Sequence, residues 1–389
     1  MDTQRIGITW QVSDCHGWGI FGLNLARNLL EQGPCRPLMF TPPTFIDLDM
    51  AVQETLAPCF REGIKMIADH QETGVFLDKS VVLHSLNNVF RPTALSVRIT
   101  GRANVGFVFF ESADIQPDAI ERVSRLDRLL VGSTWNLEMC RRAGMENVAF
   151  VSQGVDTEIF RLGPRQGVPS GRFVVYSGGK LEYRKGQDLV LEAFKRFRQK
   201  HPDSVLITAW QNSWAETAET VVVSPYISVP PRQDEAGNLR IEPWAHAHGI
   251  PGECFVDLGW TANARLPAIL READVAVFPS RCEGGTNLCA MEAMACGVPT
   301  ILTANTGHLD LIEDGNCYPV TDQKPCFDGF DKTGEWMEAS VDGIVDSLER
   351  AYADTEDRKR RGANGAATLK NLSWQVQVPA LVEAISDLF

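Results

Sequence analysis

The sequence predicts an α/β protein made of two Rossmann-like, doubly wound domains that face each other across a cleft. Short apolar runs alternate with amphipathic stretches along the chain, a pattern typical of parallel strands connected by helices. A stretch rich in glycine and proline, residues 163–171, interrupts the alternation, which then restarts. With 389 residues, the chain is long enough for two domains. We expect these domains to cover residues 1–164 and 165–372.

In the first half, short apolar runs predict strands, and apolar residues three to four positions apart predict helices. The expected strands cover residues 6–10, 37–40, 81–84, 105–110, 128–131 and 148–151. The expected helices cover residues 22–32, 115–125 and 136–142.

The second half repeats this order of elements, and its last residues have helical spacing. Residues 209–244, which hold Trp210 and Trp214, depart from the pattern and are expected to form an insertion beside the cleft. The expected strands cover residues 173–176, 204–208, 254–258, 275–278, 299–302 and 317–320. The expected helices cover residues 187–200, 265–272, 287–296 and the segment 373–389.

The composition of the chain argues against several classes of protein. The net charge of −13 argues against nucleic-acid binding, and no apolar run approaches the ~18 residues that span a bilayer. Ten cysteines without a Cys-x-x-Cys pair argue against a zinc site or a disulfide framework, and with no secretory signal at the start they favour the cytoplasm. Five arginines could form a patch for peripheral membrane contact, although a solvated helix face explains them better: Arg122, Arg125, Arg128, Arg141 and Arg142.

A strand, a glycine loop and a helix follow one another over residues 275–297. Thr286 is expected to cap the helix, and Gly297 to end it. The first helical turn would then offer unpaired N–H groups to an anion. Glu292 is the only formally charged residue between Gly284 and Leu309, and it falls on an apolar helix face. A ligand hydroxyl near Glu292 would satisfy this carboxylate, and so would a structural partner such as a backbone N–H or a buried arginine.

A second glycine turn joins a strand to an amphipathic helix at residues 177–187. Lys180 and Lys185 stand five residues apart in it and can clamp a diphosphate, although a turn with two solvated lysines has the same sequence. A third segment, Gly17-Trp-Gly19-Ile-Phe-Gly22, matches a dinucleotide fingerprint. It lies seven residues past the strand end at Trp10, and no acid follows the second strand, which weakens a nicotinamide-binding interpretation.

These segments resemble the signature of retaining glycosyltransferases of the two-Rossmann-domain (GT-B) architecture, in particular family four. The signature has two acids, the second followed by Ala-Met-Ala and Gly-x-Pro. The resemblance implies that Glu292 binds the ribose of a nucleotide and that Glu283 lies near the donor sugar. Eight residues separate the two acids here, where the family usually has seven. The resemblance also implies that the terminal segment crosses back to the first domain.

Other site residues follow from the same resemblance. Lys180 and Lys185 correspond to the basic residues that grip the donor diphosphate, together with the backbone near Gly285, Thr286, Asn287 and Leu288. Gly17 and Gly19 are expected to border the cleft near the donor phosphate. The family often has a histidine at the sugar. In this chain His84 serves, Glu111 at the end of the next strand serves, or the contact is lost, and a His84 bonded only to backbone fits the sequence as well. We prefer Glu111 as a sugar-side or acceptor-side group.

The predicted function is therefore metal-independent, retaining transfer of a sugar from a nucleoside-diphosphate sugar to a glycan, lipid or protein. No resident cofactor and no catalytic metal are expected, because Asp47 and Asp49 precede a probable helix and suit N-capping. No residue stands out as a general base, and in such enzymes the leaving diphosphate itself takes the acceptor proton. Two alternatives stay open: a sugar-nucleotide-binding protein without transfer activity, and an NAD-dependent oxidoreductase.

Overall fold

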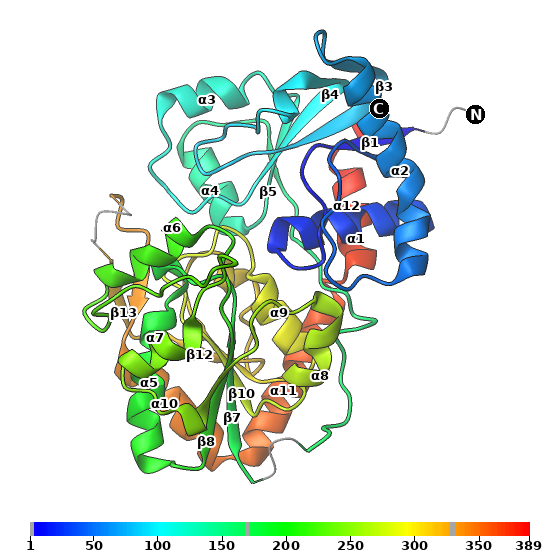
Figure 1. The fold of residues 1–389 in the computed structure, drawn as a ribbon. Coiled ribbons are helices and arrows are strands. Elements are labelled where there is room, and N and C mark those ends of the chain that lie inside the picture. The colour runs from blue at the N-terminus through cyan, green and yellow to red at the C-terminus, as the bar shows by residue number, and fades with distance from the viewer. Residues whose placement is uncertain (1–3, 168–170, 327–331) are drawn as a thin grey trace.

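The computed structural model describes residues 4–167, 171–326 and 332–389. Its described strands form two six-stranded sheets and one two-stranded ribbon. Figure 1 shows the two large sheets in separate lobes, the first coloured blue to cyan and the second mainly green to yellow. The predicted fold class, two doubly wound α/β domains, is confirmed. The division of the chain between residues 164 and 165 stays a prediction.

The first sheet is parallel throughout, with strand order β2-β1-β3-β4-β5-β6. The order reverses between β1 and β3, which creates a switch point at their carboxyl ends. Its strands are β1 (Arg5–Ile8), β2 (Arg36–Met39), β3 (Val75–Ser85), β4 (Ile99–Val108), β5 (Arg128–Val131) and β6 (Val148–Phe150). Its helices are α1 (Gly17–Glu31), α2 (Met50–Asp69), α3 (Pro117–Val123) and α4 (Thr134–Arg142).

The second sheet is also parallel, with order β12-β11-β10-β7-β8-β9 and a switch point between β7 and β10. Its strands are β7 (Phe173–Gly178), β8 (Ser204–Ala209), β9 (Phe255–Asp257), β10 (Val275–Phe278), β11 (Thr300–Thr303) and β12 (Tyr318–Val320). The ribbon pairs β13 (Gln323–Pro325) with β14 (Met337–Ala339). The helices are α5 (Gln187–Lys200), α6 (Ala215–Ala218), α7 (Ile241–Ala247), α8 (Leu266–Leu270), α9 (Leu288–Ala295), α10 (Val341–Ala353) and α11 (Thr355–Lys370).

Helix α1 begins five residues earlier than the sequence pattern predicts. The backbone N–H of Gly19 donates to Nδ1 of His16 at 3.1 Å, so the imidazole caps the helix. Gly17 and Gly19 therefore belong to the first helical turn, and the expectation of a glycine loop there is wrong. The preceding loop covers residues 9–16, between β1 and α1.

Helix α9 begins one residue later than predicted, and its cap is a different residue. Asn287, with φ of 59°, accepts a hydrogen bond from the backbone N–H of Ala290 at 3.4 Å. Asparagine tolerates this left-handed conformation better than most residues, because its short amide bonds to nearby backbone. The Thr286 hydroxyl lies instead beside Met291 Sδ at 3.0 Å, so the prediction that Thr286 caps the helix is wrong.

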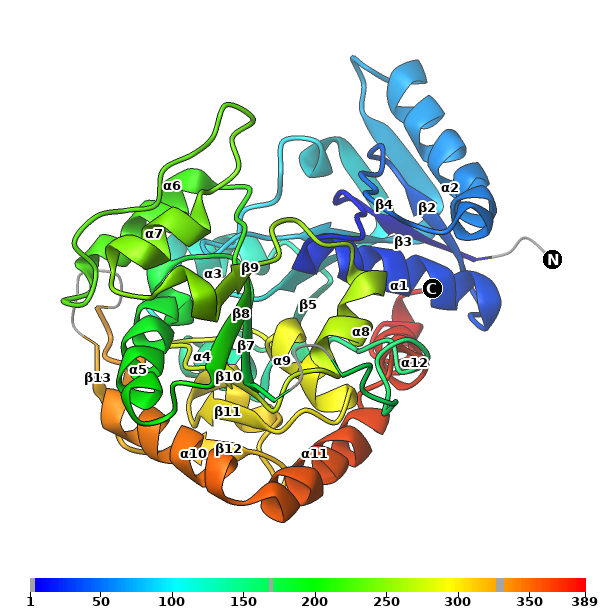
Figure 2. The ribbon, with the colours of Figure 1, turned by 60° about the horizontal axis from the view of Figure 1, so that its bottom comes forward.

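The last helix, α12 (Trp374–Glu383), lies beside α1 in the first lobe, as Figures 1 and 2 show. Trp374 is buried and packs against Phe21 with ring centroids 5.4 Å apart. Val378 and Leu381 belong to the same apolar core as β1 and β3. The chain thus leaves the second lobe after α11 and ends on the first.

The structure also places the predicted linker, the cysteines and the surface arginines. In the predicted linker, residues 168–170 lie outside the described residues, and Arg165 pairs with Asp274 at 3.0 Å. Within the described residues, no two cysteines form a disulfide. In the described part of the chain, no helix is long and apolar enough to cross a membrane.

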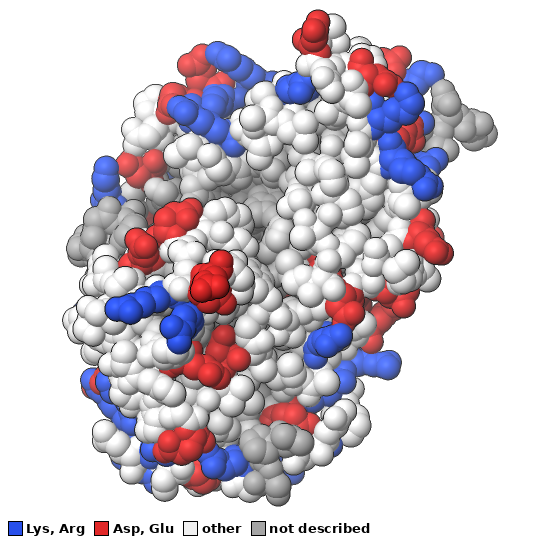
Figure 3. All heavy atoms as spheres, viewed as in Figure 1, with Lys and Arg blue, Asp and Glu red and all other residues white. Residues whose placement is uncertain are grey.

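Charges of both signs are interspersed on the face in Figure 3. Four of the five patch arginines have acidic partners: Arg122 with Asp118, Arg125 with Glu121, Arg128 with Asp387 and Arg142 with Glu138.

Candidate active site

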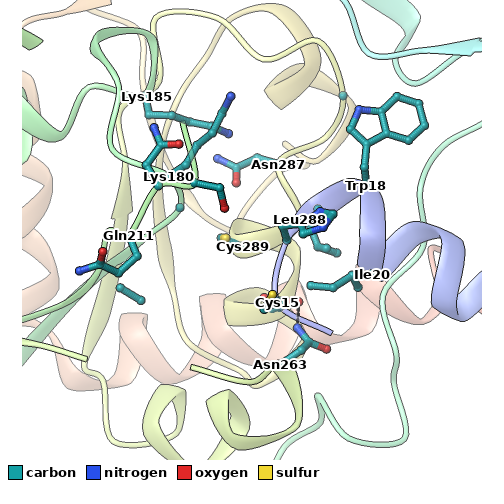
Figure 4. A pocket seen from close by; sticks show the side chains of 18 of the residues that line it. Cys15, Trp18, Ile20, Lys180, Lys185, Gln211, Asn263, Asn287, Leu288 and Cys289 are labelled. Atoms are coloured by element: carbon teal, nitrogen blue, oxygen red, sulfur yellow. Dashed lines mark hydrogen bonds between the residues drawn. The ribbon is translucent and has the colours of Figure 1, made fainter. Parts of the chain in front are cut away.

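A cavity of about 320 Å³ lies between the two lobes, and its entrance is visible as a hollow in Figure 3. Its walls come from the carboxyl ends of β7 and β10 in the second domain and from the loop before α1 in the first. Binding sites of doubly wound sheets lie at such switch points. Figure 4 shows Lys180, Lys185, Asn287 and Leu288 converging on this space from the second domain.

Glu292 stands on α9 at the bottom of the cavity. Its side chain is only 3% exposed, and Asn263 donates a hydrogen bond to its Oε1. Burial raises the pKa of the Glu292 carboxyl to about 8. The hydrogen bond from Asn263 lowers this pKa, and the nearby charge of Asp156 raises it further. Among the described residues, Asn263 is the one hydrogen-bond partner of this carboxyl, which is largely protonated at pH 7 because of its raised pKa. A ligand that donated hydroxyl groups to it would favour its ionised form.

Glu283 has a very different environment, although it is equally buried. Ser280 Oγ donates to Oε1 at 2.6 Å, and Lys185 Nζ lies 2.8 Å from both carboxylate oxygens. Arg184 approaches Oε2 at 3.1 Å. Burial alone would raise the pKa of Glu283, but Lys185 and Arg184 outweigh it and hold the pKa at about 2. Glu283 is therefore a fixed anion at neutral pH.

Arg184 is a charged site residue that sequence reasoning missed. It is buried between three carboxylates: it bonds to Glu182, lies 3.1 Å from Glu283 and lies 3.3 Å from Glu111 of the first domain. The signal in the sequence is its position directly before Lys185, in the same glycine turn. Because Glu111 belongs to the first domain, this guanidinium joins the two halves of the cavity.

Lys180 and Lys185 both line the cavity, as predicted, but they are held differently. Lys180 pairs with Glu182 at 3.1 Å, and its ammonium lies 5.4 Å from the centre of the Trp214 ring. Lys185 is the partner of Glu283. The following residue, Gly186, has φ of 74°, and a Cβ there would lie 2.3 Å from the carbonyl oxygen of Pro279. Only glycine fits there, so it fixes the turn that holds Lys185.

The loop between the two acids places three of its residues at the cavity and buries Thr286. Gly285, Asn287 and Leu288 line the cavity, whereas the buried Thr286 bonds to Gln153 at 3.1 Å and is not among its lining residues. Burial lowers the pKa of His308 to about 4, so its neutral ring donates to the Thr303 carbonyl through Nδ1 and accepts from Asn287 through Nε2. This hydrogen bond holds the left-handed turn at the start of α9.

The two domains touch at this loop. A Cβ on Gly284 would lie 2.5 Å from the carbonyl oxygen of Phe110, so only glycine permits this approach. Ser133 donates to the Gly284 carbonyl at 2.9 Å, and the Trp336 indole donates to the Glu111 carbonyl at 2.7 Å. These contacts hold Glu111 at the cavity wall, beside the groups of the second domain.

The first domain contributes some, but not all, of the predicted residues. Glu111 and Gly17 line the cavity, whereas Gly19 lies behind its wall, where a Cβ would meet Ser13. His84 is away from the site: it is buried and bonds to Ser96 at 2.7 Å and to Asn104 at 3.1 Å. Sequence reasoning missed the lining residues Cys15, His16, Trp18, Gln211, Asn212 and Asn263.

The buried Glu292 makes stability depend on pH. Its folded pKa of about 8 exceeds the ordinary 4.5, so its contribution is fully present below pH 4.5 and is lost as pH rises through 8. We expect Glu292→Gln to be nearly as stable as wild type at pH 5 and more stable at pH 8.5, by up to about 4 kcal/mol. Urea unfolding at both values measures this, with the exposed Glu356→Gln as control. A gap between the proteins that does not change with pH would contradict the assignment.

Removal of Arg184 tests the ionic cluster. Arg184→Met leaves the buried Glu182 and Glu283 and the partly exposed Glu111 without their shared cation, so we expect the free energy of unfolding at pH 7 to fall by roughly 3–5 kcal/mol. Arg125→Met, which breaks an exposed pair with Glu121, should change it by less than about 0.5 kcal/mol. Denaturant titrations of both variants give the comparison. Equal losses would show that Arg184 does not stabilise the cluster.

Comparisons with known proteins agree with this geometry. Residues 161–368 match the family described as glycosyl transferases group 1. The chain is 28% identical over 254 residues to a GDP-mannose-dependent α-(1-6)-phosphatidylinositol monomannoside mannosyltransferase of Mycolicibacterium smegmatis, covering 60% of this chain and 54% of that protein. It is 26% identical over 239 residues to a D-inositol 3-phosphate glycosyltransferase of Arthrobacter sp., covering 60% and 48%. The chain spans about half the length of these curated relatives.

Solved structures share the whole fold. Sucrose-phosphate synthase from Thermosynechococcus elongatus superposes with a TM-score of 0.67 at 18% identity, covering 99% of both chains. HepE from Anabaena, in complex with UDP and glucose, gives a TM-score of 0.64 at 14% identity, covering 98% of this chain and 99% of that one. The matched segment contains Lys180, Lys185, Glu283 and Glu292 and covers more than half of the chain. This protein therefore belongs to the glycosyl transferases group 1 family.

Proposed function

We propose that this protein transfers a glycosyl group from a nucleoside-diphosphate sugar to an acceptor hydroxyl, with retention of anomeric configuration and without a metal ion. The observation that carries the proposal is the convergence of four features in one cavity. Lys180 and Lys185, the start of α9, and the two buried acids Glu283 and Glu292 all line it. They lie at the switch point between β7 and β10.

Each feature suits one part of the donor. The ammonium groups of Lys180 and Lys185 and the backbone amides at Asn287 and Leu288 suit the diphosphate, because a helix start and two cations both favour negative charge. Glu292, a turn further along α9, suits the ribose hydroxyls. Glu283 lies at the β10 end of the cavity and suits the donor sugar, as the family resemblance implies.

The charges in the cavity support a mechanism driven by stabilisation of the leaving group. Negative charge grows on the diphosphate as its bond to the anomeric carbon breaks, and preorganised cations lower the energy of that state. Glu283 is a poor base and a poor nucleophile, because its pKa is about 2 and cations occupy both of its oxygens. We therefore propose that the leaving diphosphate accepts the proton of the attacking hydroxyl, which fits transfer with retention.

The same arrangement supports the proposal of metal independence. Lys180 and Lys185 can supply the positive charge that a divalent ion supplies in other transferases. The pair Asp47 and Asp49 has structural partners: Asp49 caps α2, and Asp47 bonds to Arg265 of the second domain. Cysteines that form no disulfide in the described part of the chain suit a reducing compartment such as the cytoplasm.

The observations weigh against a nicotinamide cofactor. A dinucleotide fingerprint needs a tight turn directly between strand and helix, and here the loop over residues 9–16 separates β1 from α1. Strand β2 ends at Met39 and is followed by Phe40 and Thr41 without an acid for the ribose.

Thermal unfolding with UDP, GDP, ADP, TDP and NADH, with and without EDTA, tests the proposal. One nucleoside diphosphate at 100 times its dissociation constant should stabilise the wild type by about 2.7 kcal/mol, a shift of several degrees, and EDTA should not change it. Glu292→Ala should lose the shift, and the exposed Glu356→Gln should keep it. The matching nucleotide sugars then test transfer by release of the nucleoside diphosphate.

Stabilisation by NADH alone, or by none of these compounds, would refute the donor site. Normal binding of one nucleoside diphosphate without turnover of any of its sugars would favour a binding protein over a transferase. An EDTA-sensitive shift would contradict metal independence.

A further inference from the structure

The cavity divides its charges unequally between the two domains. All of its lysines and arginines, Lys180, Arg184 and Lys185, come from the second domain. Among the described residues that line the cavity from the first domain there is no lysine or arginine, and the charged ones are Asp14 and Glu111. The first-domain half of the cavity therefore contributes no lysine or arginine of its own, and the cation that reaches it, Arg184, is the partner of Glu111.

The polar groups of this half are already engaged or uncharged. Both Asp14 oxygens accept backbone N–H groups of residues 46 and 47, each at 2.8 Å. Glu111 pairs with Arg184. Burial lowers the pKa of His16, against the influence of Asp14, and its Nδ1 accepts from the Gly19 N–H, so the neutral ring carries its proton on Nε2. The His16 cap also occupies an N–H at the start of α1 that would otherwise be available to an anion.

Trp18 and Phe109, which we call the aromatic platform, form the rest of this wall. Trp18 lines the cavity (Figure 4) and packs edge to face on Phe109 with ring centroids 4.9 Å apart. Trp10 supports it from behind at 5.3 Å and donates its indole N–H to the Trp18 carbonyl at 3.0 Å. The platform is thus held rigidly by its neighbours. A flat apolar ring beside hydrogen-bonding groups suits a sugar ring, which has apolar C–H faces and a polar rim.

We propose that the acceptor is an uncharged saccharide bound against Trp18, and that phosphorylated sugars and phosphoinositide headgroups are poor acceptors. This inference rests on the proposed function. A hydroxyl oxygen of the saccharide bonds to the anomeric carbon of the donor, the bond from that carbon to the diphosphate oxygen breaks, and the hydroxyl proton passes to the diphosphate. A phosphate on the acceptor would lose its hydration beside Asp14 and Glu111 without gaining a cation from this wall. The chain would thereby differ from relatives whose names specify inositol phosphates.

Paired saccharides test this inference on the full-length protein saturated with the nucleoside diphosphate that stabilises it. The pairs are glucose with glucose 6-phosphate and myo-inositol with inositol 1-phosphate, and maltose adds a longer neutral saccharide. Isothermal titration and ligand-observed NMR measure binding, and mass spectrometry detects transfer from the nucleotide sugar. We expect at least one neutral saccharide to bind at least tenfold more tightly than any phosphorylated one, and to be the one that is glycosylated.

Variants at position 18 assign the binding to the platform. Trp18→Ala should weaken the neutral saccharide at least tenfold while nucleoside diphosphate affinity stays within twofold, which also shows that the variant folds. Trp18→Phe should keep most of the saccharide affinity, and Phe76→Ala, which removes an aromatic side chain that is 68% exposed on β3, should leave it unchanged.

Three outcomes would overturn the inference: tighter binding or faster glycosylation of a phosphorylated partner, no binding of any neutral saccharide, or equal affinity in Trp18→Ala. In each case a nucleoside diphosphate still binds, so the proposed donor site survives. Failure of every nucleoside diphosphate to bind would instead refute the proposed function itself.

Discussion

The arrangement of the site depends on one buried interaction, the ion cluster around Arg184. A guanidinium removed from water is stable only where carboxylates surround it, and Arg184 lies among Glu111, Glu182 and Glu283. These groups come from the end of β4, the turn after β7 and the loop after β10. The cluster therefore fixes two loops of the second domain relative to each other, and it draws Glu111 of the first domain into the same site.

The two acids of the family signature, Glu283 and Glu292, have different pKa values because their surroundings differ. Glu283 is surrounded by cations and stays ionised, with a pKa of about 2, whereas Glu292 has one amide donor and a pKa of about 8. The oxygens of Glu283 already contact Lys185 and Arg184. Glu292 can still accept further hydrogen bonds from a ligand, because Asn263 is its one amide donor among the described residues. This difference is our physical reason for assigning the ribose to Glu292.

Elements and site residues that depend on residues close in the sequence were predicted. Site residues that depend on contacts between residues distant in the sequence were missed. The predicted helix 187–200 matches α5, because its apolar spacing is local. Lys180 and Lys185 were identified because a glycine turn places them. Arg184 was missed, since its value lies in contacts to Glu111 and Glu283, which are 73 and 99 residues away in the sequence. His16 and Trp18 were missed for a related reason: the glycine pattern drew attention to Gly17 and Gly19, whereas the side chains between and before them line the cavity. His84 ends a strand as predicted, but Ser96 and Asn104 bind its ring.

The central claim is that Glu292 is held protonated until a nucleotide donates hydroxyl groups to it. Isothermal titration of the stabilising nucleoside diphosphate at pH 7.5, in two buffers with different ionisation enthalpies, counts the protons released on binding. We predict that the wild type releases most of one proton more than Glu292→Gln, because a group with a pKa of about 8 is largely protonated before binding and ionised after it. The Gln variant removes this proton and retains a neutral side chain of the same size, so ionisation of the diphosphate itself is subtracted. Equal proton release by the two proteins would contradict the claim.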